Sequence, residues 1–197
     1  MTVLAPPPSP HATDDLWVFG YGSLIWNPGF AFVEQTPARL VGAHRALCIY
    51  SMVHRGTPER PGLVLGLDRG GACQGVAFRV AASRREATIA YLRAREQVTR
   101  VYCEVMRPVV LDRDGGRRAR ALVYIADRRH PQYAGQLTLD QQLRLVRQGH
   151  GGAGPNAAYV LATVAALEDH GIRDARLHQL AALLCDDNVA TSPASSV

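Results

Sequence analysis

The chain contains the stretch Val18-Phe19-Gly20-Tyr21-Gly22-Ser23-Leu24. Its first residues, together with Trp17 before them, are apolar and β-forming, which predicts a buried strand. The two glycines that follow permit a sharp turn and leave main-chain N–H groups uncovered. Beside a serine hydroxyl, such N–H groups can bind an anionic or carbonyl oxygen. Taken alone, however, the stretch favours a plain β-strand and a glycine turn over a binding loop.

Short apolar runs fill most of the first two-thirds of the chain, and clusters of glycine and proline separate them. Runs of this kind indicate strands, which we expect at residues 16–19, 46–52, 63–67, 75–80, 101–111 and 119–125. Residues 112–116, Asp-Arg-Asp-Gly-Gly, are typical of a tight hairpin turn, because aspartate and glycine tolerate positive φ. The last two strands are therefore expected to pair antiparallel.

Helices are expected around and after these strands. One is predicted at residues 83–95, where Ser83 can cap the first turn and Glu86 completes a capping-box pattern. The last third of the chain predicts helices at 138–148, 156–170 and 174–184, and Thr138 with Gln141 repeats the capping-box pattern. Because strand and helix do not alternate strictly, we expect a mixed α+β domain. A curved or barrel-like antiparallel sheet would carry helices on its outside.

The length of 197 residues suits one compact domain. We expect a flexible leader at residues 1–15, the domain at 16–185 and a disordered tail at 186–197. The first 15 residues lack the basic start and apolar core of a secretory signal. No apolar run approaches the roughly 20 residues that span a bilayer. Since the four cysteines are far apart and form no C-x-x-C pair, we expect a soluble protein of the reducing cytoplasm, without membrane attachment.

The basic residues exclude several classes of mechanism. All 22 are arginine, because the sequence contains no lysine. There can be no Schiff-base lysine and no Walker-type phosphate loop. The histidines show no H-E-x-x-H spacing, so no metal site is expected. Arginine does grip carboxylates through two parallel hydrogen bonds, which makes small acidic molecules the expected partners.

Two other classes of function fit poorly. The formal charge of +5 would permit nucleic-acid binding, but the arginines are scattered and no basic stripe with interleaved aromatic residues is present. We therefore expect no nucleic-acid partner. Residues 20–25 resemble the dinucleotide fingerprint G-x-G-x-x-G only superficially, because Ile25 occupies the third glycine position. Ser23 also lacks the flanking glycines of a nucleophile elbow, so its hydroxyl is better suited to hydrogen bonding.

Glu96 breaks a local rule. It directly follows the predicted helix at 83–95, where the helix dipole presents partial negative charge and disfavours an acid. Such breaches are commoner at functional sites, and the dipole together with burial would raise the pKa of this carboxyl toward the range of a general base. The alternative is a surface glutamate paired with Arg93 three residues earlier, and the helix alone favours that alternative.

Taken together, these segments resemble the ChaC-type γ-glutamylcyclotransferases, which act on glutathione. The resemblance covers most of the chain. It rests on the shared order of the Y-G-S-L loop, an H-R-G and P-G loop, the segment of the catalytic glutamate and two later motifs, which correspond here to residues 17–26, 54–62, 91–96, 127–133 and 154–159.

The resemblance implies the γ-glutamylcyclotransferase-like fold and a cofactor-independent ring closure that gives 5-oxoproline and Cys-Gly. It implies that Glu96 is the catalytic base and acid. Tyr159 would contact the substrate or its neighbours, and Arg55 would bind the glycine carboxylate. The main-chain N–H groups of the loop would hold the γ-glutamyl group, which makes the predicted substrate-binding residues Val18, Phe19, Gly20, Tyr21, Gly22, Ser23, Leu24, Arg55 and Tyr159.

Three alternatives stay open at this point. Within the enzyme class, the substrate could be another γ-glutamyl peptide or a γ-glutamylamine, since these share the reacting end with glutathione. From a different class, the chain could be a γ-glutamyl-binding protein without turnover, although the retained Glu96 argues against that. A nucleic-acid-binding protein is the most distant alternative.

Overall fold

The computed structural model describes residues 15–112 and 115–190. The expected leader, apart from Asp15, and residues 191–197 of the expected tail lie outside the described residues. Five strands form a closed barrel in the order β1-β3-β2-β4-β5. Their bounds are Leu16–Gly20 (β1), Glu34–Ser51 (β2), Gly62–Val80 (β3), Tyr102–Leu111 (β4) and Arg117–Ala126 (β5).

The barrel is antiparallel except at one seam. β1 pairs antiparallel with β3 and parallel with β5, and this parallel seam closes the barrel. β4 and β5 pair antiparallel along their whole length, as the turn at 112–116 predicted, although residues 113–114 of that turn lie outside the described residues. The expected α+β class with a barrel-like sheet is therefore confirmed.

Three strand predictions were wrong in their extent. The runs at 63–67 and 75–80 belong to one strand, β3, and the run at 46–52 is only the end of the long β2. The pairing between β2 and β3 shifts register between Val41 and Ala43 and again between Leu47 and Ile49. Irregularities of this kind let a long ribbon bend without interrupting it. A pair of glycines is typical of a turn, but Gly70 and Gly71 lie inside β3, with φ of 94° and 70°.

The helix that ends at Glu96 starts differently from the prediction. A 3-10 turn at Ala82–Arg84 precedes α1 (Arg85–Glu96), and no side chain caps either of them. The predicted cap at Ser83 was therefore wrong, because Ser83 lies within the 3-10 turn rather than before the helix. The end of α1 agrees with the sequence to one residue and places Glu96 in its last position.

The later helices follow the prediction more closely. α2 (Leu139–Gln148) begins with a complete capping box, in which the side chains of Thr138 and Gln141 each accept a hydrogen bond from the backbone N–H of the other. A short hairpin of β6 (His150–Gly151) and β7 (Gly154–Pro155) leads into α3 (Asn156–Asp169). α4 (Ala175–Ala190) continues beyond the predicted end at residue 184, so residues 186–190 are helical and not part of a disordered tail.

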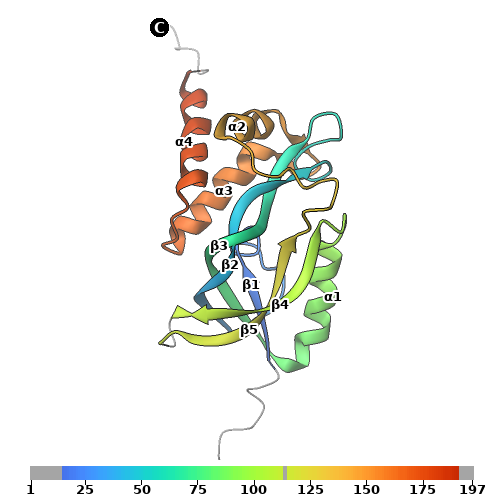
Figure 1. Ribbon diagram of the computed structural model, residues 1–197, viewed down its shortest axis with the longest axis vertical. Helices are drawn as coiled ribbons and strands as arrows, with labels where there is room; N and C mark the ends of the chain where they lie inside the picture. Colours follow the sequence, from blue (N-terminus) through green and yellow to red (C-terminus); the bar gives the residue numbers. More distant parts are fainter. Residues whose placement is uncertain (1–14, 113–114, 191–197) are drawn as a thin grey trace, which may run out of the picture.

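Figure 1 shows α1 on one side of the barrel and α2, α3 and α4 grouped on another. Both helical layers are held by apolar burial. Leu92 of α1 is fully buried against Val18 and Leu122 of the barrel. On the other side, Val160 and Leu167 of α3 join the large core that fills the barrel. The helices therefore fix their ends relative to the strand termini, where the cavity described next is found.

Candidate active site

A cavity of about 510 Å³ lies between the loop after β1, the end of β2, the end of α1 and the start of α3. Its volume is typical of small-molecule sites, which range over roughly 300–1,000 Å³. The predicted residues that line it are Tyr21, Gly22, Ser23, Leu24, Arg55, Glu96 and Tyr159. Val18, Phe19 and Gly20 lie within β1 in the barrel wall instead, outside the lining of this cavity.

The loop after β1 presents unpaired main-chain donors at the cavity. Its turn is closed by hydrogen bonds from Ile25 N to Gly22 O (2.8 Å) and from Asn27 N to Ser23 O (2.9 Å). Within the described ranges, the N–H groups of Gly22, Ser23 and Leu24 donate to no protein acceptor. Adjacent free N–H groups at a cavity can bind a carboxylate or a developing oxyanion.

The glycines of this loop are required by space rather than by unusual dihedrals. Neither Gly20 nor Gly22 has positive φ, so the predicted need for conformational freedom was wrong. A Cβ atom at Gly20 would lie 3.1 Å from the Phe78 ring, and one at Gly22 would lie 3.2 Å from the Leu65 side chain. A side chain at either position would push the loop away from β3.

Glu96 is mostly buried, with 16% of its side chain exposed. Burial raises the pKa of this carboxyl above its usual value, although the charge of Arg95 and a hydrogen bond from it act in the opposite direction. The alternative of a surface pair with Arg93 was wrong, because Arg93 binds Glu104 instead, with 2.7 Å between Nη2 and Oε1. A partly desolvated carboxyl of this kind is suited to accept and return a proton near neutral pH.

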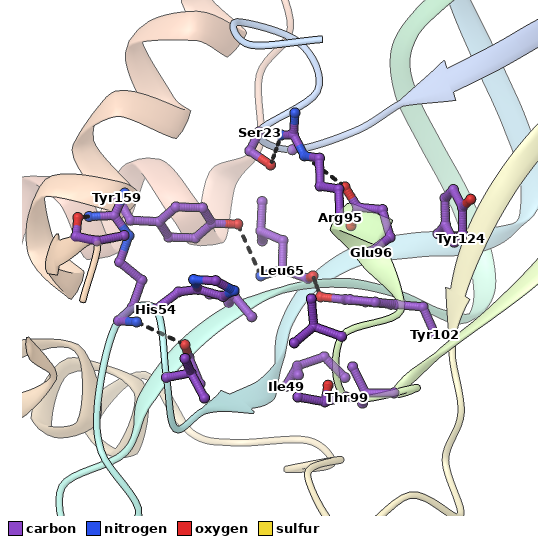
Figure 2. Close-up of a pocket in the computed structure, with 18 of the residues that line it drawn as sticks. Ser23, Ile49, His54, Leu65, Arg95, Glu96, Thr99, Tyr102, Tyr124 and Tyr159 are labelled. Carbon is purple, nitrogen blue, oxygen red and sulfur yellow. Dashed lines mark hydrogen bonds and ion pairs between the residues drawn. The ribbon is translucent and has the colours of Figure 1, made fainter. Parts of the chain in front are cut away.

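Arg95 connects the two sides of the site. Its Nη2 donates to Ser23 Oγ (2.9 Å), its Nη1 donates to the carbonyl of Asn27 (2.5 Å), and its Nε lies 3.1 Å from Glu96 Oε1. Figure 2 shows this side chain between Ser23 and Glu96. Sequence reasoning recognised only that a cation suits the end of a helix and missed this link, since the partners are far apart in the chain.

Four tyrosine side chains line the same cavity as Glu96: Tyr21, Tyr102, Tyr124 and Tyr159. Burial is the main cause that raises the pKa of each phenol, and the charge of Glu96 contributes to every one of these shifts. The phenols therefore stay protonated at neutral pH. Tyr102 and Tyr124 were not predicted as site residues, because their segments are indistinguishable from ordinary strands in the sequence.

Arg55 also lines the cavity. Its Nη1 donates to the carbonyls of Ala153 (2.5 Å) and Pro155 (3.2 Å), and its guanidinium lies 5.5 Å from the centre of the Tyr159 ring. These contacts hold the β6–β7 hairpin against the loop after β2. The predicted role of Arg55 toward a carboxylate stays a prediction. The neighbouring His54 also lines the cavity.

Other nucleophiles and metal ligands have different surroundings. Burial raises the pKa of the Cys48 thiol to about 12, which makes it an unreactive filler. Ser23 Oγ is bound by the Arg95 cation and not by a base. In the part of the chain that the structure describes, no group of three or more His, Cys, Asp or Glu side chains could hold a metal ion, and no helix is long and apolar enough to cross a membrane.

Sequence comparisons extend over nearly the whole described chain. Residues 16–186 match the model of the family described as ChaC-like protein. A glutathione-specific gamma-glutamylcyclotransferase of Escherichia coli (strain K12) is 38% identical over 165 residues, which cover 84% of this chain and 71% of that protein. The glutathione-specific gamma-glutamylcyclotransferase 1 of Danio rerio is 35% identical over 150 residues, with coverage of 74% and 76%.

The fold has a close counterpart among solved structures. The crystal structure of a gamma-glutamylcyclotransferase specific to glutathione from yeast matches with a TM-score of 0.79 at 23% sequence identity, and the match covers 88% of this chain and 96% of that one. The expected γ-glutamylcyclotransferase-like fold is thereby confirmed. Since the family match also includes the loop after β1 and Glu96, the chain belongs to the ChaC-like family.

Proposed function

We propose that this protein is a glutathione-specific γ-glutamylcyclotransferase, which converts the γ-glutamyl group of glutathione to 5-oxoproline and releases Cys-Gly. The names of the relatives from Escherichia coli and Danio rerio support the substrate. The observation that carries the mechanism is the position of Glu96, a partly desolvated carboxyl that lines the same cavity as the free N–H groups of Gly22, Ser23 and Leu24.

The first step is the loss of a proton from the substrate's α-ammonium group. Glu96 accepts this proton, which frees the lone pair of the α-amine. Burial raises the pKa of Glu96, so its basicity is better matched to an amine than that of an exposed glutamate. The cation of Arg95, 3.1 Å from Oε1, acts in the opposite direction and favours the ionised form that accepts the proton.

The freed amine then attacks the γ-carbonyl carbon of the same glutamyl group. A new C–N bond closes the five-membered lactam while the carbonyl oxygen gains negative charge. N–H groups of Gly22, Ser23 and Leu24 donate to this oxygen or to the α-carboxylate and hold the glutamyl group in a bent shape. Since both reacting groups belong to one molecule, this orientation supplies much of the rate enhancement.

In the last step the bond to the cysteine nitrogen breaks. Protonated Glu96 delivers its proton to that nitrogen and Cys-Gly leaves as the free dipeptide. The restored carboxylate then takes the second proton from the ring nitrogen and passes it to the dipeptide's amine or to water, which leaves neutral 5-oxoproline and ionised Glu96. The sequence of steps transfers only protons and one acyl bond, so it is a cofactor-independent lyase reaction. The Cys-Gly part would extend toward Arg55 and His54, which also line the cavity, because the cation of Arg55 suits the glycine carboxylate.

Purified protein incubated with glutathione tests the proposal directly. We expect stoichiometric 5-oxoproline and Cys-Gly, followed by chromatography, and a large loss of turnover for Glu96→Gln. Asp68→Asn is the matched control, because Asp68 is also a buried carboxyl but lies outside the cavity lining. Absence of 5-oxoproline from the folded wild-type protein would refute the proposed activity.

Substrate choice can be measured in the same assay. γ-Glu-Ala in competition with glutathione reports whether the enzyme uses the Cys-Gly part, and we expect glutathione to be preferred. A γ-glutamyl-binding protein without turnover would instead show saturable binding by calorimetry while no product forms.

We also propose that the protein works in the cytoplasm, since its four cysteines are all free thiols and a reducing compartment preserves them. Fractionation of cells that express the tagged chain tests this location. We further expect no salt-sensitive binding to DNA or RNA.

A further inference from the structure

Along residues 63–65, one edge of β3 has no neighbouring strand, and side chains bind its main-chain N–H and C=O groups instead. On one side this part of β3 pairs with β2, whereas β1 reaches only Val76–Val80 on the other side. The Asn156 side chain accepts from Leu63 N (2.6 Å) and donates to Leu63 O (2.7 Å). Two residues later, the hydroxyls of Tyr159 and Tyr102 form hydrogen bonds with the main-chain N–H and C=O groups of Leu65.

The two hydroxyls at Leu65 must have opposite hydrogen-bond polarity. Leu65 N lies 3.2 Å from the Tyr159 oxygen, and because an amide N–H can only donate, Tyr159 accepts this bond. The Tyr102 oxygen lies 2.7 Å from Leu65 O, and because a carbonyl can only accept, Tyr102 donates. These assignments follow from the chemistry of the partners and need no observed hydrogen atoms.

The bonds to Leu65 leave different capacities for a ligand. Tyr159 keeps its own proton to donate, and the described residues offer that proton no acceptor. Tyr102 has used its proton and keeps lone pairs that can accept. Figure 2 shows the two rings reaching Leu65 from opposite directions, with Glu96 nearby. Both side chains line the cavity.

The neighbours of the Tyr159 and Tyr102 hydroxyls indicate which substrate group each hydroxyl would bind. A Cβ built on Gly22 would lie 3.8 Å from the Tyr159 hydroxyl, so this donor is next to the loop that carries the free N–H groups. Glu96 is close enough to raise the pKa of both phenols through its charge. Burial is the larger cause and raises the pKa of Tyr159 to about 12, so its proton is retained for donation through neutral pH.

We propose that Tyr159 and Tyr102 are two further catalytic residues with opposite roles, set by the main chain of Leu65. Tyr159 donates to the γ-carbonyl oxygen as negative charge develops on it during ring closure. Tyr102 accepts a hydrogen bond from an N–H of the α-amino group. This bond orients the amine so that the lone pair of its nitrogen points toward the carbonyl carbon. Neither phenol gains or loses a proton in the reaction, since Glu96 carries the transferred proton. The inference rests on the proposed cyclotransferase activity.

For Tyr159, the test is Tyr159→Phe in steady-state kinetics with glutathione. Loss of a donor to a developing oxyanion is expected to lower kcat roughly 10²- to 10³-fold, whereas KM changes little. Tyr133→Phe is the matched control, because it also removes one tyrosine hydrogen bond, to the buried Asp68 (2.9 Å), but Tyr133 does not line the cavity. A purely structural role would give both variants lower thermal stability and near-normal kcat, which would overturn the assignment for Tyr159.

For Tyr102, the test is a binding cycle in the Glu96→Gln background, where turnover is stopped. Calorimetry compares glutathione with its analogue that lacks the α-amino group. We expect Tyr102→Phe to weaken glutathione binding roughly tenfold and to leave binding of the des-amino analogue unchanged. Equal weakening of both ligands, or of neither, would overturn the assignment for Tyr102.

Site-specific 3-fluorotyrosine covers the case in which a phenylalanine variant does not fold. Fluorine keeps the hydroxyl and its bond to Leu65 but makes it a stronger donor and a weaker acceptor. With 3-fluorotyrosine at position 159 we expect kcat to be maintained or raised, and with 3-fluorotyrosine at position 102 we expect glutathione binding to weaken. The same changes in kcat and in glutathione binding at both positions would overturn the opposite hydrogen-bond polarity of the two hydroxyls. If the wild-type protein forms no 5-oxoproline, the proposed function fails, yet the binding cycle still reports whether Tyr102 detects the amine.

Discussion

Asp68 and Glu96 are both buried carboxyls, but their surroundings differ. The side chain of Asp68 is 2% exposed and accepts hydrogen bonds from Arg128 Nε (2.6 Å), the Tyr133 hydroxyl (2.9 Å) and Arg69 N (2.9 Å). Glu96 is 16% exposed, and its carboxyl is paired with the side chain of Arg95, next to it in the chain. One carboxyl is fully satisfied by the fold, whereas the other has unused hydrogen-bonding capacity.

The pKa values of the two carboxyls shift in opposite directions. Burial alone would raise the pKa of Asp68, but the hydrogen bonds from Arg128, Tyr133 and the backbone of Arg69 outweigh it and hold the pKa below its usual value. At Glu96 burial outweighs the opposing effects of Arg95, and the pKa is raised. Burial therefore does not by itself decide the direction in which the pKa of these two carboxyls shifts; the number of donors to the ionised form does.

The largest effect that would sharpen this comparison is on turnover. Glu96→Gln should lower kcat by roughly 10²- to 10⁴-fold, since it removes the proton acceptor and donor. Asp68→Asn should keep kcat within about threefold, because its carboxyl touches no reacting group. Steady-state rates of 5-oxoproline formation by the two folded variants check this. Comparable losses for both variants would contradict the division of roles.

The next largest effect is on stability, where Asp68→Asn is expected to lose more than Glu96→Gln. Asp68→Asn should lower the free energy of unfolding by about 1–3 kcal/mol, because it weakens charge-assisted bonds to Arg128 and Tyr133. Those bonds hold residues 127–133 against β3. Urea denaturation monitored by circular dichroism measures the change. We expect Glu96→Gln to be no less stable than the wild type at pH 7, and a larger loss there than in Asp68→Asn would break the comparison.

A smaller effect is expected when the partner of Glu96 is removed. Arg95→Gln should lower kcat/KM about tenfold, because hydrogen bonds from a charged donor to Ser23 and Asn27 are lost. Since the cation of Arg95 lowers the pKa of Glu96, its removal should also move the acidic limb of the kcat/KM profile to higher pH. Arg93→Gln is the control, as Arg93 pairs with Glu104 outside the cavity lining. An unmoved acidic limb in Arg95→Gln would argue against this coupling.

The smallest expected effect is the pH dependence of stability. A lowered pKa at Asp68 stabilises the fold above the unfolded-state pKa of about 3.9, and this contribution is lost as the pH falls through the folded-state value. A raised pKa at Glu96 favours the fold most below the unfolded-state value of about 4.3, and the fold is weakened as the pH rises through the higher folded-state value.

Unfolding free energies of both variants relative to wild type, measured from pH 3 to pH 8, check these signs. The destabilisation in Asp68→Asn should be largest near neutral pH and shrink in acid. Any stabilisation in Glu96→Gln should also be largest near neutral pH and vanish in acid. Parallel curves of the same sign would show that the two carboxyls do not differ as described.

Several features were predictable from local sequence because local forces decide them. The strand before Gly20, the capping box at Thr138 and the antiparallel pairing of β4 with β5 each depend on residues close together in the chain. The position of Glu96 at the end of α1 was predictable for the same reason. Motif order in addition indicated the family, which the comparisons confirm.

Other features could not be predicted, because partners distant in sequence decide them. The continuity of β3 through Gly70 and Gly71 depends on its pairing with β2. The roles of Tyr102 and Asn156 depend on an edge of β3 that β1 leaves uncovered. Neither residue type is unusual for a strand or a helix start, so the sequence alone carries no signal for these contacts.

The sequence by itself determined the strand, the glycine loop and an acid at a helix end, because dihedral preferences, hydrogen bonding within one turn and the helix dipole act over a few residues. Only the tertiary structure decided that Glu96, Ser23, Tyr102 and Tyr159 line one cavity. Closure of the barrel in the order β1-β3-β2-β4-β5 brings them together. That closure is set by long-range strand pairing and apolar burial, and the same burial raises the pKa of Glu96.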